Sequence, residues 1–242
     1  NHTVYGITNN NLNEAKAKER KLANIISQDY KILENCSIII LALPIKNLIN
    51  PSKNLIKAIP TKAILTDVGS VKAPIIKTWE KIHDLFIGSH PMAGTEKKGV
   101  NAGKIELFDN SKWVITPTNR TDQIALKTLS KLFKNMGCDI CFENPDIHDQ
   151  AVANISHLPI YLASCLIETA YCQNNEDLLN LSKKLAASGF SDTSRVGAGN
   201  PSLGVDLAEN NTINILNSIK NFKKNINEIE KIFEEKNWDV LE

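Results

Sequence analysis

The chain has 242 residues and a mass of 26.8 kDa, and 42% of its residues are hydrophobic and 23% are charged. This length and composition fit one large or two modest globular domains and exclude disordered and low-complexity chains. Lysine and arginine (28 residues) balance aspartate and glutamate (27 residues), so we expect no nucleic-acid partner, which would require a clearer basic excess. No run approaches about 18 consecutive apolar residues, and we therefore expect no membrane span.

The five cysteines are scattered and odd in number, and no signal peptide is visible. This pattern is typical of reduced thiols in the cytoplasm. Cys138 and Cys141 form a C-x-x-C motif, but no second pair accompanies them, and residues three apart on a strand point to opposite faces. We therefore predict neither a metal site nor a redox site there.

Strand and helix signals alternate over the first 144 residues, which predicts a doubly wound parallel sheet. The run 36–43 (CSIIILAL) is apolar throughout, which is typical of a central parallel strand buried on both faces. Helices are expected between the strands, with Pro51 as a break in the second helix. The expected strands are 3–7, 36–43, 63–66, 85–87, 112–116 and 138–142, and the expected helices are 12–20, 45–59, 71–82 and about 121–135.

From residue 145 to residue 242 the pattern is helical and predicts a second domain. The segment 146–172 is apolar on more than one side, which indicates burial on more than one side, and Pro159 interrupts it. A last helix has apolar residues at steps of three and four from Ile215 to Phe233. Such a helix packs within its own domain or pairs with a second subunit, and the sequence leaves both alternatives open.

Three loops follow apolar strands of the first domain, at residues 41–44, 67–72 and 88–95. Ligands of parallel sheets bind at the carboxyl ends of the strands, so Ser70 and His90 should meet in one crevice. His90 is either a loop histidine that caps a backbone carbonyl or a general base active near neutral pH. Ser70 either caps a helix that begins at Val71, orients His90 through its hydroxyl, or does both.

A second polar cluster lies in the helical half. His157, beside Pro159, either packs between helices or lines a pocket. Arg195 lies in the predicted glycine-rich loop ASGFSDTSRVGAGNP, and it is one of only three arginines in a chain with 25 lysines. A lone arginine there suggests a bidentate contact with a carboxylate, and the alternative is a salt bridge between domains or subunits.

Four segments, DVGSVK, GSHPMAGTEKKGV, IHDQAVANISHLP and ASGFSDTSRVGAGNP, together resemble the prephenate/arogenate dehydrogenases of tyrosine biosynthesis. The resemblance runs from residue 3 to about residue 216 and is closest to the cyanobacterial arogenate-type members. It implies a Rossmann-like dinucleotide-binding domain (residues 1–144) followed by an all-α substrate and dimerisation domain (residues 145–242), through which a homodimer forms. The implied reaction is oxidative decarboxylation of a small cyclohexadienol acid, with hydride transfer to a nicotinamide.

The resemblance also implies roles for individual residues. His90 would accept the proton of the ring hydroxyl, while Ser70 would hold the imidazole and lie near the nicotinamide. Arg195 would bind a substrate carboxylate, with His157 and Thr95 in the same pocket. The cofactor-binding residues would be Thr8, Asn9, Leu43, Pro44 and Ser70.

The chain departs from the family pattern at two places. Because residues 1–7 already read as a strand, we expect the glycine-rich G-x-G-x-x-G turn upstream of Asn1, and the chain as given to bind cofactor poorly. This leaves a non-catalytic helical dimer, an interaction module derived from such an enzyme, as the rival function. Prephenate-using relatives often carry a histidine where this chain has Ile160, so arogenate is the expected substrate.

The residues after the first strand bear on the choice of cofactor. They are Thr8 and three asparagines, with no carboxylate to repel a 2′-phosphate and no arginine to bind one. We expect NADP, with NAD as the alternative.

Overall fold

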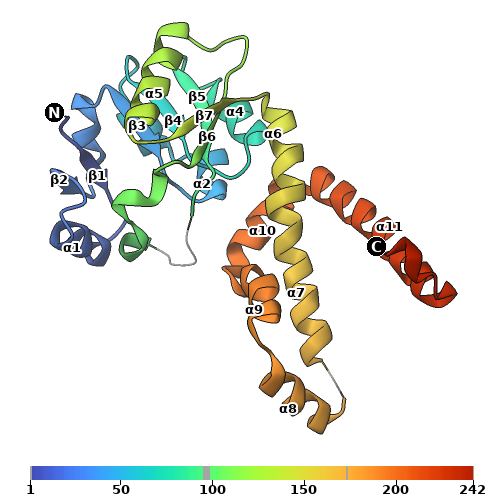
Figure 1. Cartoon of the computed structure of the whole chain (residues 1–242). Helices are drawn as coiled ribbons and strands as arrows, with labels where there is room; N and C mark the ends of the chain where they lie inside the picture. The colour runs from blue at the N-terminus through green and yellow to red at the C-terminus, as the bar shows by residue number, and fades with distance from the viewer. Residues whose placement is uncertain (1, 95–98, 173, 242) are drawn as a thin grey trace. The chain divides into compact units, whose positions relative to one another are not determined.

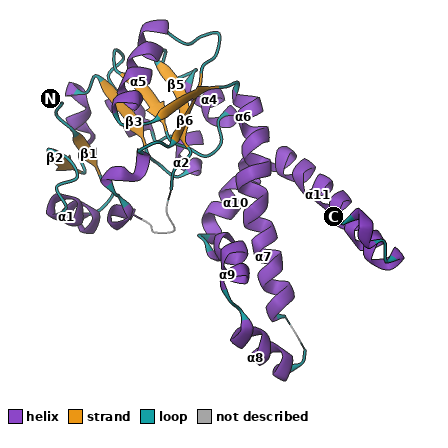
Figure 2. Cartoon of the chain, in the orientation of Figure 1, coloured by secondary structure: helices purple, strands orange, loops and turns teal. Residues whose placement is uncertain are grey.

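The computed structural model describes residues 2–94, 99–172 and 174–241. The chain divides into two compact units, Asn1–His148 and Asp149–Glu242. In the described residues all strands lie in the first unit, and the second unit consists of helices (Figure 2). The predicted α/β domain followed by an all-α domain is confirmed. Pro145, where we expected the second domain to begin, is the first residue of helix α6.

The first unit contains a five-stranded sheet in the order β3-β4-β5-β6-β7 (Figure 1). All neighbouring pairs are parallel except β5 and β6, which are antiparallel. A separate parallel pair consists of β1 and β2. The strands are β1 (Tyr5–Ile7), β2 (Ile25–Ser27), β3 (Ile38–Leu41), β4 (Ile64–Asp67), β5 (Phe86–Pro91), β6 (Lys112–Thr116) and β7 (Asp139–Phe142).

The helices of the first unit begin at residues suited to that position. Asn10, Ser52 and Asp122 each accept a backbone N–H of the first turn, which satisfies a donor that the helix leaves open. The break predicted at Pro51 is confirmed, because two short helices replace one. The helices are α1 (Asn11–Glu19), η1 (Tyr30–Asn35), α2 (Ile45–Ile49), α3 (Lys53–Ala58), α4 (Ala73–Trp79), η2 (Gly99–Ala102), η3 (Ile105–Phe108) and α5 (Gln123–Asn135).

The core of this unit lies between the sheet and α5. The rings of Trp113 on β6 and Phe133 on α5 stack with centroids 3.9 Å apart, and Leu129 and Ile115 are fully buried beside them. Burying four large apolar side chains contributes roughly 1.5–3 kcal/mol each. This cluster fixes β6, the strand that pairs with the end of β5.

Two expectations about the strands were wrong. The run 36–43 is not a central strand, because β3 lies at one end of the five-stranded sheet and Ile40 is 39% exposed. The strand at 85–87 does not end before His90. It continues to Pro91, because residues 88–91 pair antiparallel with β6. Gly88 and Pro91 are typical of turns and conceal this long-range pairing in the sequence.

A third expectation concerned the start of α4. We expected a helix from Val71, with Ser70 as one candidate for its cap. Helix α4 begins at Ala73 and its N-cap residue is Lys72, without a side-chain cap. Ser70 is therefore not the cap residue, because it lies two residues before the N-cap position.

Lys72 forms a buried ion pair with Asp67, and both side chains are fully inaccessible to solvent. The ammonium of Lys72 also donates to the carbonyl of Ser89 (2.6 Å). The carboxylate of Asp67 accepts the backbone N–H groups of Gly69 (2.8 Å) and Ser89 (3.2 Å). Because buried charges need a partner and hydrogen bonds for their remaining atoms, this network fixes the end of β4 against β5 and the start of α4.

The second unit is a set of helices around α7. The predicted interruption near Pro159 is confirmed, since a π-helical turn (η4) lies between α6 and α7. The segment 187–201, which we expected to be a loop, forms α9 and the turn η5. Helix α6 (Pro145–Val152) spans the boundary between the two units. The other elements are η4 (Ala153–His157), α7 (Leu158–Tyr171), α8 (Glu176–Leu185), α9 (Ser188–Ser194), η5 (Arg195–Ala198), α10 (Pro201–Asn210), α11 (Thr212–Glu235) and η6 (Trp238–Val240).

The helical run Pro145–Tyr171 has the length and the mean hydropathy, 1.2, of a membrane-spanning helix. Its apolar residues are interrupted by polar ones, so the run does not stand out in the sequence as an unbroken apolar stretch. Core helices of other proteins meet the same two criteria. This run also carries buried polar side chains at His148, Asp149 and His157, and such side chains are expensive in lipid.

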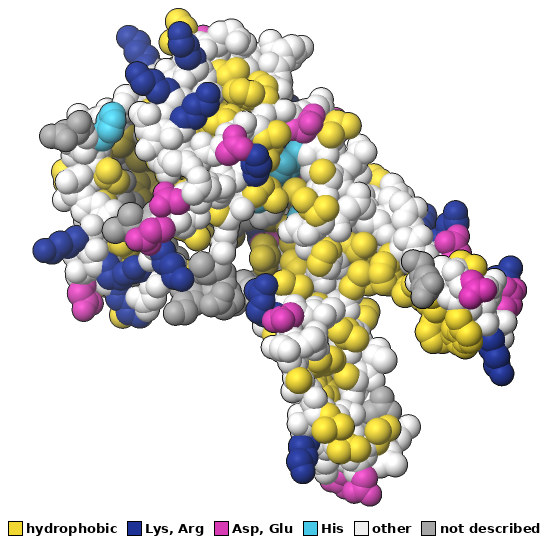
Figure 3. All heavy atoms as spheres, in the orientation of Figure 1, with side chains coloured by type: hydrophobic (Ala, Val, Ile, Leu, Met, Phe, Trp, Pro, Cys, Tyr) yellow, Lys and Arg dark blue, Asp and Glu magenta, His cyan; other side chains and the backbone are white. Residues whose placement is uncertain are grey.

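Many apolar side chains of the second unit are exposed, and Figure 3 shows them over its helices. On α11, Ile215 is buried in the unit, whereas Ile226, Ile229 and Phe233 are exposed. The apolar side of this helix is therefore buried near its start and exposed further along, where Phe233 contacts the ring of Trp238.

We expect Lys72→Met to lower the free energy of unfolding by about 3–5 kcal/mol, because it leaves the carboxylate of Asp67 buried without its cation. Lys77→Met is the matched control, since Lys77 lies exposed on the same helix and should change stability by less than about 0.5 kcal/mol. Urea unfolding monitored by circular dichroism measures both. A Lys72→Met protein as stable as the parent would contradict the role of the ion pair.

Candidate active site

The ends of strands β3, β4 and β5 bring the predicted site residues of the first unit to one edge of the sheet. Ile38↔Ile64 and Leu65↔Phe86 pair in parallel, so the chain leaves all three strands in the same direction. Leu43 and Pro44 follow β3, Ser70 follows β4, and His90 lies near the end of β5. This is the arrangement that the sequence predicts for a ligand crevice.

His90 is 9% exposed, and its Nδ1 lies 2.9 Å from Nε2 of His148 on α6. The two rings are close to perpendicular, with an interplanar angle of 73° and centroids 5.2 Å apart. Sequence reasoning missed His148, although it lies in the segment IHDQ that contributed to the family resemblance. The two histidines are 58 residues apart, and only the tertiary fold brings them together.

The hydroxyl of Ser70 was expected to hold the His90 imidazole. In the structure the Nδ1 atom of His90 is directed at His148, and Ser70 is half-buried in the turn between Asp67 and Lys72. That turn is closely packed, since a Cβ atom at Gly69 would lie 2.6 Å from Ile75 Cδ1 and 2.9 Å from Asp67 Oδ2. A side chain at position 69 would therefore have to displace buried side chains, including the carboxylate of Asp67. The role of Ser70 toward the nicotinamide stays a prediction.

The backbone that carries His90 is held from both sides through its neighbour Ser89. The hydroxyl of Ser89 donates to the carbonyl of Asp67 (2.7 Å) and accepts the indole N–H of Trp113 (3.0 Å). Thr66 lies within 3.0 Å of the same hydroxyl. Because all these groups are buried and paired, the position of His90 is set by strands β4 and β6 and not by a flexible loop.

The segment after β1 offers neutral hydrogen-bonding groups. The side-chain oxygen of Asn9 accepts the amide groups of Asn10 (2.9 Å) and Asn13 (3.0 Å), which fixes the orientation of the Asn9 amide. Leu43, which is 37% exposed, and Pro44 present an apolar surface after β3. Sugar hydroxyls and the flat rings of a dinucleotide fit amide groups and apolar surfaces of this kind.

In the second unit His157 is buried and lies 3.2 Å from the side-chain amide of Asn211, measured from Nδ1 to Nδ2. The same amide donates to the backbone carbonyl of Asp149 (2.8 Å). These contacts favour the alternative in which His157 packs between helices. Its role in a substrate pocket stays a prediction.

Arg195 is exposed at the first position of η5 and forms no ion pair with the part of the chain that the structure describes. Its segment lies directly on α7, because a Cβ atom at Gly197 would be 2.6 Å from the Ser164 nitrogen. Tyr161 donates to the carbonyl of Gly204 (2.8 Å), and burial raises the pKa of its hydroxyl. Arg195 is thus an available cation on a fixed support.

Thr95, the remaining predicted site residue, lies outside the described residues.

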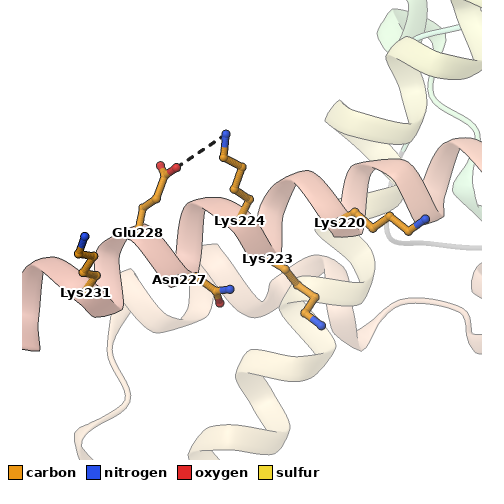
Figure 4. A pocket seen from close by; sticks show the side chains of 6 residues that line it. All are labelled: Lys220, Lys223, Lys224, Asn227, Glu228 and Lys231. Atoms are coloured by element: carbon orange, nitrogen blue, oxygen red, sulfur yellow. Dashed lines mark ion pairs between the residues drawn. The ribbon is translucent and has the colours of Figure 1, made fainter.

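A second polar surface lies on α11 and is shown in Figure 4. Four lysines, Asn227 and Glu228 line a shallow hollow there, and Lys224 lies 3.9 Å from Glu228. All the lining groups come from one exposed helix, so this hollow does not bring together the convergent, buried groups that catalysis requires. The lysines are Lys220, Lys223, Lys224 and Lys231.

Two family models match the chain. The model described as prephenate dehydrogenase, nucleotide-binding domain, matches residues 1–142, and the model described as prephenate dehydrogenase, dimerization domain, matches residues 144–242. Among curated relatives, prephenate dehydrogenase of Bacillus subtilis is 29% identical over 213 residues, and that of Lactococcus lactis is 30% identical over 224 residues. These matches cover 86% and 88% of this chain but only 57% and 59% of the relatives, so the chain spans less than two thirds of their length.

Solved structures match over more of their length. Synechocystis arogenate dehydrogenase is 36% identical, with a TM-score of 0.81, and the match covers 99% of this chain and 86% of that one. Prephenate dehydrogenase from Aquifex aeolicus, in complex with hydroxyphenyl propionate and NAD+, is 26% identical with a TM-score of 0.91, over 100% of this chain and 85% of that one.

We expect Gly197→Ala to lower the stability of the second unit by about 1–3 kcal/mol, because the added methyl group meets the backbone of α7. Gly204→Ala is the control: a Cβ atom there meets nothing within 4 Å, and alanine favours the helix by up to about 1 kcal/mol. Thermal unfolding of both variants tests this contrast. Equal melting temperatures would show that η5 does not lie against α7 as described.

Proposed function

The chain belongs to the prephenate dehydrogenase family, and from this we propose that it catalyses the oxidative decarboxylation of arogenate in L-tyrosine biosynthesis. The observation that carries the proposal is the 36% identity with Synechocystis arogenate dehydrogenase over 99% of the chain. Prephenate is the alternative substrate, since the curated relatives described above are prephenate dehydrogenases.

His90 is the proposed general base. A neutral imidazole accepts the proton of the ring hydroxyl as a hydride leaves the same carbon, and a carbonyl forms there. The bound nicotinamide supplies the hydride acceptor. The bond to the ring carboxylate then breaks, and its electron pair enters the ring as carbon dioxide leaves. The phenolate oxygen regains its proton from His90, so the base returns to its starting state.

Arg195 is the proposed binding group for a carboxylate of the substrate. Its guanidinium is exposed on a segment packed against α7, and its planar fork suits two parallel hydrogen bonds to a carboxylate. We assign His157 and Thr95 to the same pocket, and this assignment rests on the family resemblance alone.

NADP is the proposed cofactor, held by Thr8, Asn9, Leu43, Pro44 and Ser70. The family model for the first 142 residues is that of a nucleotide-binding domain. Residues 8–11 contain no carboxylate to repel a 2′-phosphate, which supports NADP, whereas the Aquifex aeolicus relative was crystallised with NAD+. Steady-state assays with both dinucleotides decide between them.

We also propose a cytoplasmic homodimer formed through the helical unit. The family model of that unit is a dimerization domain. Exposed apolar side chains on its helices support this, because large apolar patches on a monomer indicate interaction surfaces. They include Leu178, Leu181, Leu185, Leu216, Ile226, Ile229 and Phe233. The five free thiols fit a reducing compartment.

We expect His90→Asn to lower kcat of the full-length protein by roughly 10²–10⁴-fold with little change in KM, because asparagine keeps size and polarity but is no base. Formation of the reduced nicotinamide measures both constants. His83→Gln, a change at another buried histidine of the same unit, should leave them near the parent values. A His90→Asn protein that retains most of its kcat would contradict the assignment of the base.

We expect the full-length protein to have a higher kcat/KM for arogenate than for prephenate, and Ile160→His to narrow the difference. A histidine at this position can donate to the keto-acid side chain of prephenate, and an unpaired polar group in a closed site costs about 1–3 kcal/mol. Ile167, two turns further along α7 and also half-buried, provides the control variant Ile167→His, which should leave the ratio unchanged. An unmutated protein that prefers prephenate would refute the arogenate proposal.

A further inference from the structure

The pair formed by His90 and His148 has a role that the family comparison does not assign. Resting on His90 as the base of the proposed reaction, we propose that His148 is a positioning residue that fixes the tautomer of His90. It keeps the proton of the resting imidazole on Nδ1 and thereby leaves Nε2 as the atom that accepts the substrate's proton.

The argument begins with the number of protons in the contact. His90 Nδ1 and His148 Nε2 are 2.9 Å apart, which is hydrogen-bond distance. A hydrogen bond between two nitrogens contains one proton, and in a neutral imidazole one nitrogen is a donor and the other an acceptor. The contact therefore couples the tautomers of the two rings.

The shared proton can belong to either ring, and only one of these two arrangements allows His90 to act as a base. If His148 donated to His90, then Nδ1 of His90 would be the acceptor and Nε2 would already carry a proton. If instead His90 donates through Nδ1, its Nε2 is the unprotonated ring nitrogen, and Nε2 of His148 is the acceptor. The second arrangement is the one that allows His90 to take a proton from a hydroxyl group.

Burial limits the charge that this pair of rings can carry. His90 and His148 are 9% and 3% exposed, so two imidazolium rings with facing N–H groups would be strongly disfavoured. When His90 accepts the substrate's proton, its Nδ1–H donates to a neutral His148, and this bond becomes charge-assisted and stronger. His148 thus stabilises the protonated base without bringing a second charge to the site.

Both rings have rigid supports. His90 follows Ser89, whose hydroxyl is fixed by Asp67 and Trp113. His148 lies in the second turn of α6, and its backbone N–H donates to the carbonyl of Asn144 (2.9 Å). The side chain of Asn144 also accepts the N–H of Asp146 (2.8 Å) at the start of this helix. A positioning residue needs this kind of second support, because a loosely held partner would not select one tautomer.

Selective ¹⁵N-histidine labelling of the full-length protein tests the proposal through the chemical shifts of the ring nitrogens. His90→Asn assigns the His90 signals by their loss. We expect a protonated Nδ1 and an unprotonated Nε2 on His90 of the resting protein. His148→Leu removes the acceptor and should give a mixture of tautomers, whereas His148→Gln, whose side-chain oxygen can accept, should restore the parent pattern. His83→Gln is the control for replacing a buried histidine, since the ring of His83 lies 2.7 Å from the backbone carbonyl of Ala63, away from the His90–His148 pair.

Steady-state kinetics provide the second measurement. His148→Leu should lower kcat roughly 10–100-fold with KM changed less than about threefold, and His148→Gln should recover most of the loss. A His90 that carries its proton on Nε2 in the resting protein, or an unchanged tautomer in His148→Leu, overturns the proposal. If His148→Leu does not fold, the tautomer of the parent protein and of His148→Gln decides.

The two measurements separate this proposal from the proposed function. The tautomer of His90 is read without turnover. A protein that shows no dehydrogenase activity but has the expected tautomer contradicts the proposed reaction and leaves the positioning role of His148 intact. A protein that is active but has the opposite tautomer contradicts the role of His148 and the assignment of His90 as the base that acts through Nε2, and it leaves the proposed reaction itself intact.

Discussion

The buried ion pair between Asp67 and Lys72 is the interaction on which the candidate site depends. Removing two charges from water is costly, and here the cost is offset by the attraction between the two charges and by further hydrogen bonds. Asp67 accepts hydrogen bonds from Gly69 and Ser89, and Lys72 donates to the carbonyl of Ser89. Ser70 lies in the turn between the two charged residues, and His90 follows Ser89. The network therefore fixes the backbone of both predicted catalytic residues before any ligand is considered.

The two units make different contributions to the proposed reaction. The first unit holds the proposed base, His90, on a strand fixed by β4 and β6, and it presents neutral polar groups after β1 for a dinucleotide. The second unit holds Arg195 on a turn packed against α7 and exposes apolar helices suited to a subunit interface. The proposed base and the proposed subunit interface thus lie in separate units. His148, the last residue of the first unit, belongs to the helix that joins them.

Much of the local structure was predictable because it depends on neighbouring residues. The strands at 63–66 and 112–116, the break at Pro51 and the interruption near Pro159 follow from apolar patterning and from proline geometry. The expectations that failed depend on distant partners. His90 was placed in a loop because Gly88 and Pro91 look like turn residues, and only pairing with β6 makes the segment a strand. In the segment 187–201, which was expected to be a loop, the turn η5 packs closely on α7 at Gly197.

By itself, the sequence determined the division into an α/β half and a helical half, the family, and the candidates Ser70, His90, His157 and Arg195. These conclusions rest on residue types and their order, which the sequence states directly. Only the tertiary structure decided that Lys72 is buried against Asp67, that His148 is the partner of His90 and that Asn211 is the partner of His157. These contacts join side chains 5, 58 and 54 residues apart. A hydrogen bond needs two atoms within about 3 Å of each other, and for such separations that distance is set by how strands and helices pack and not by the intervening residues.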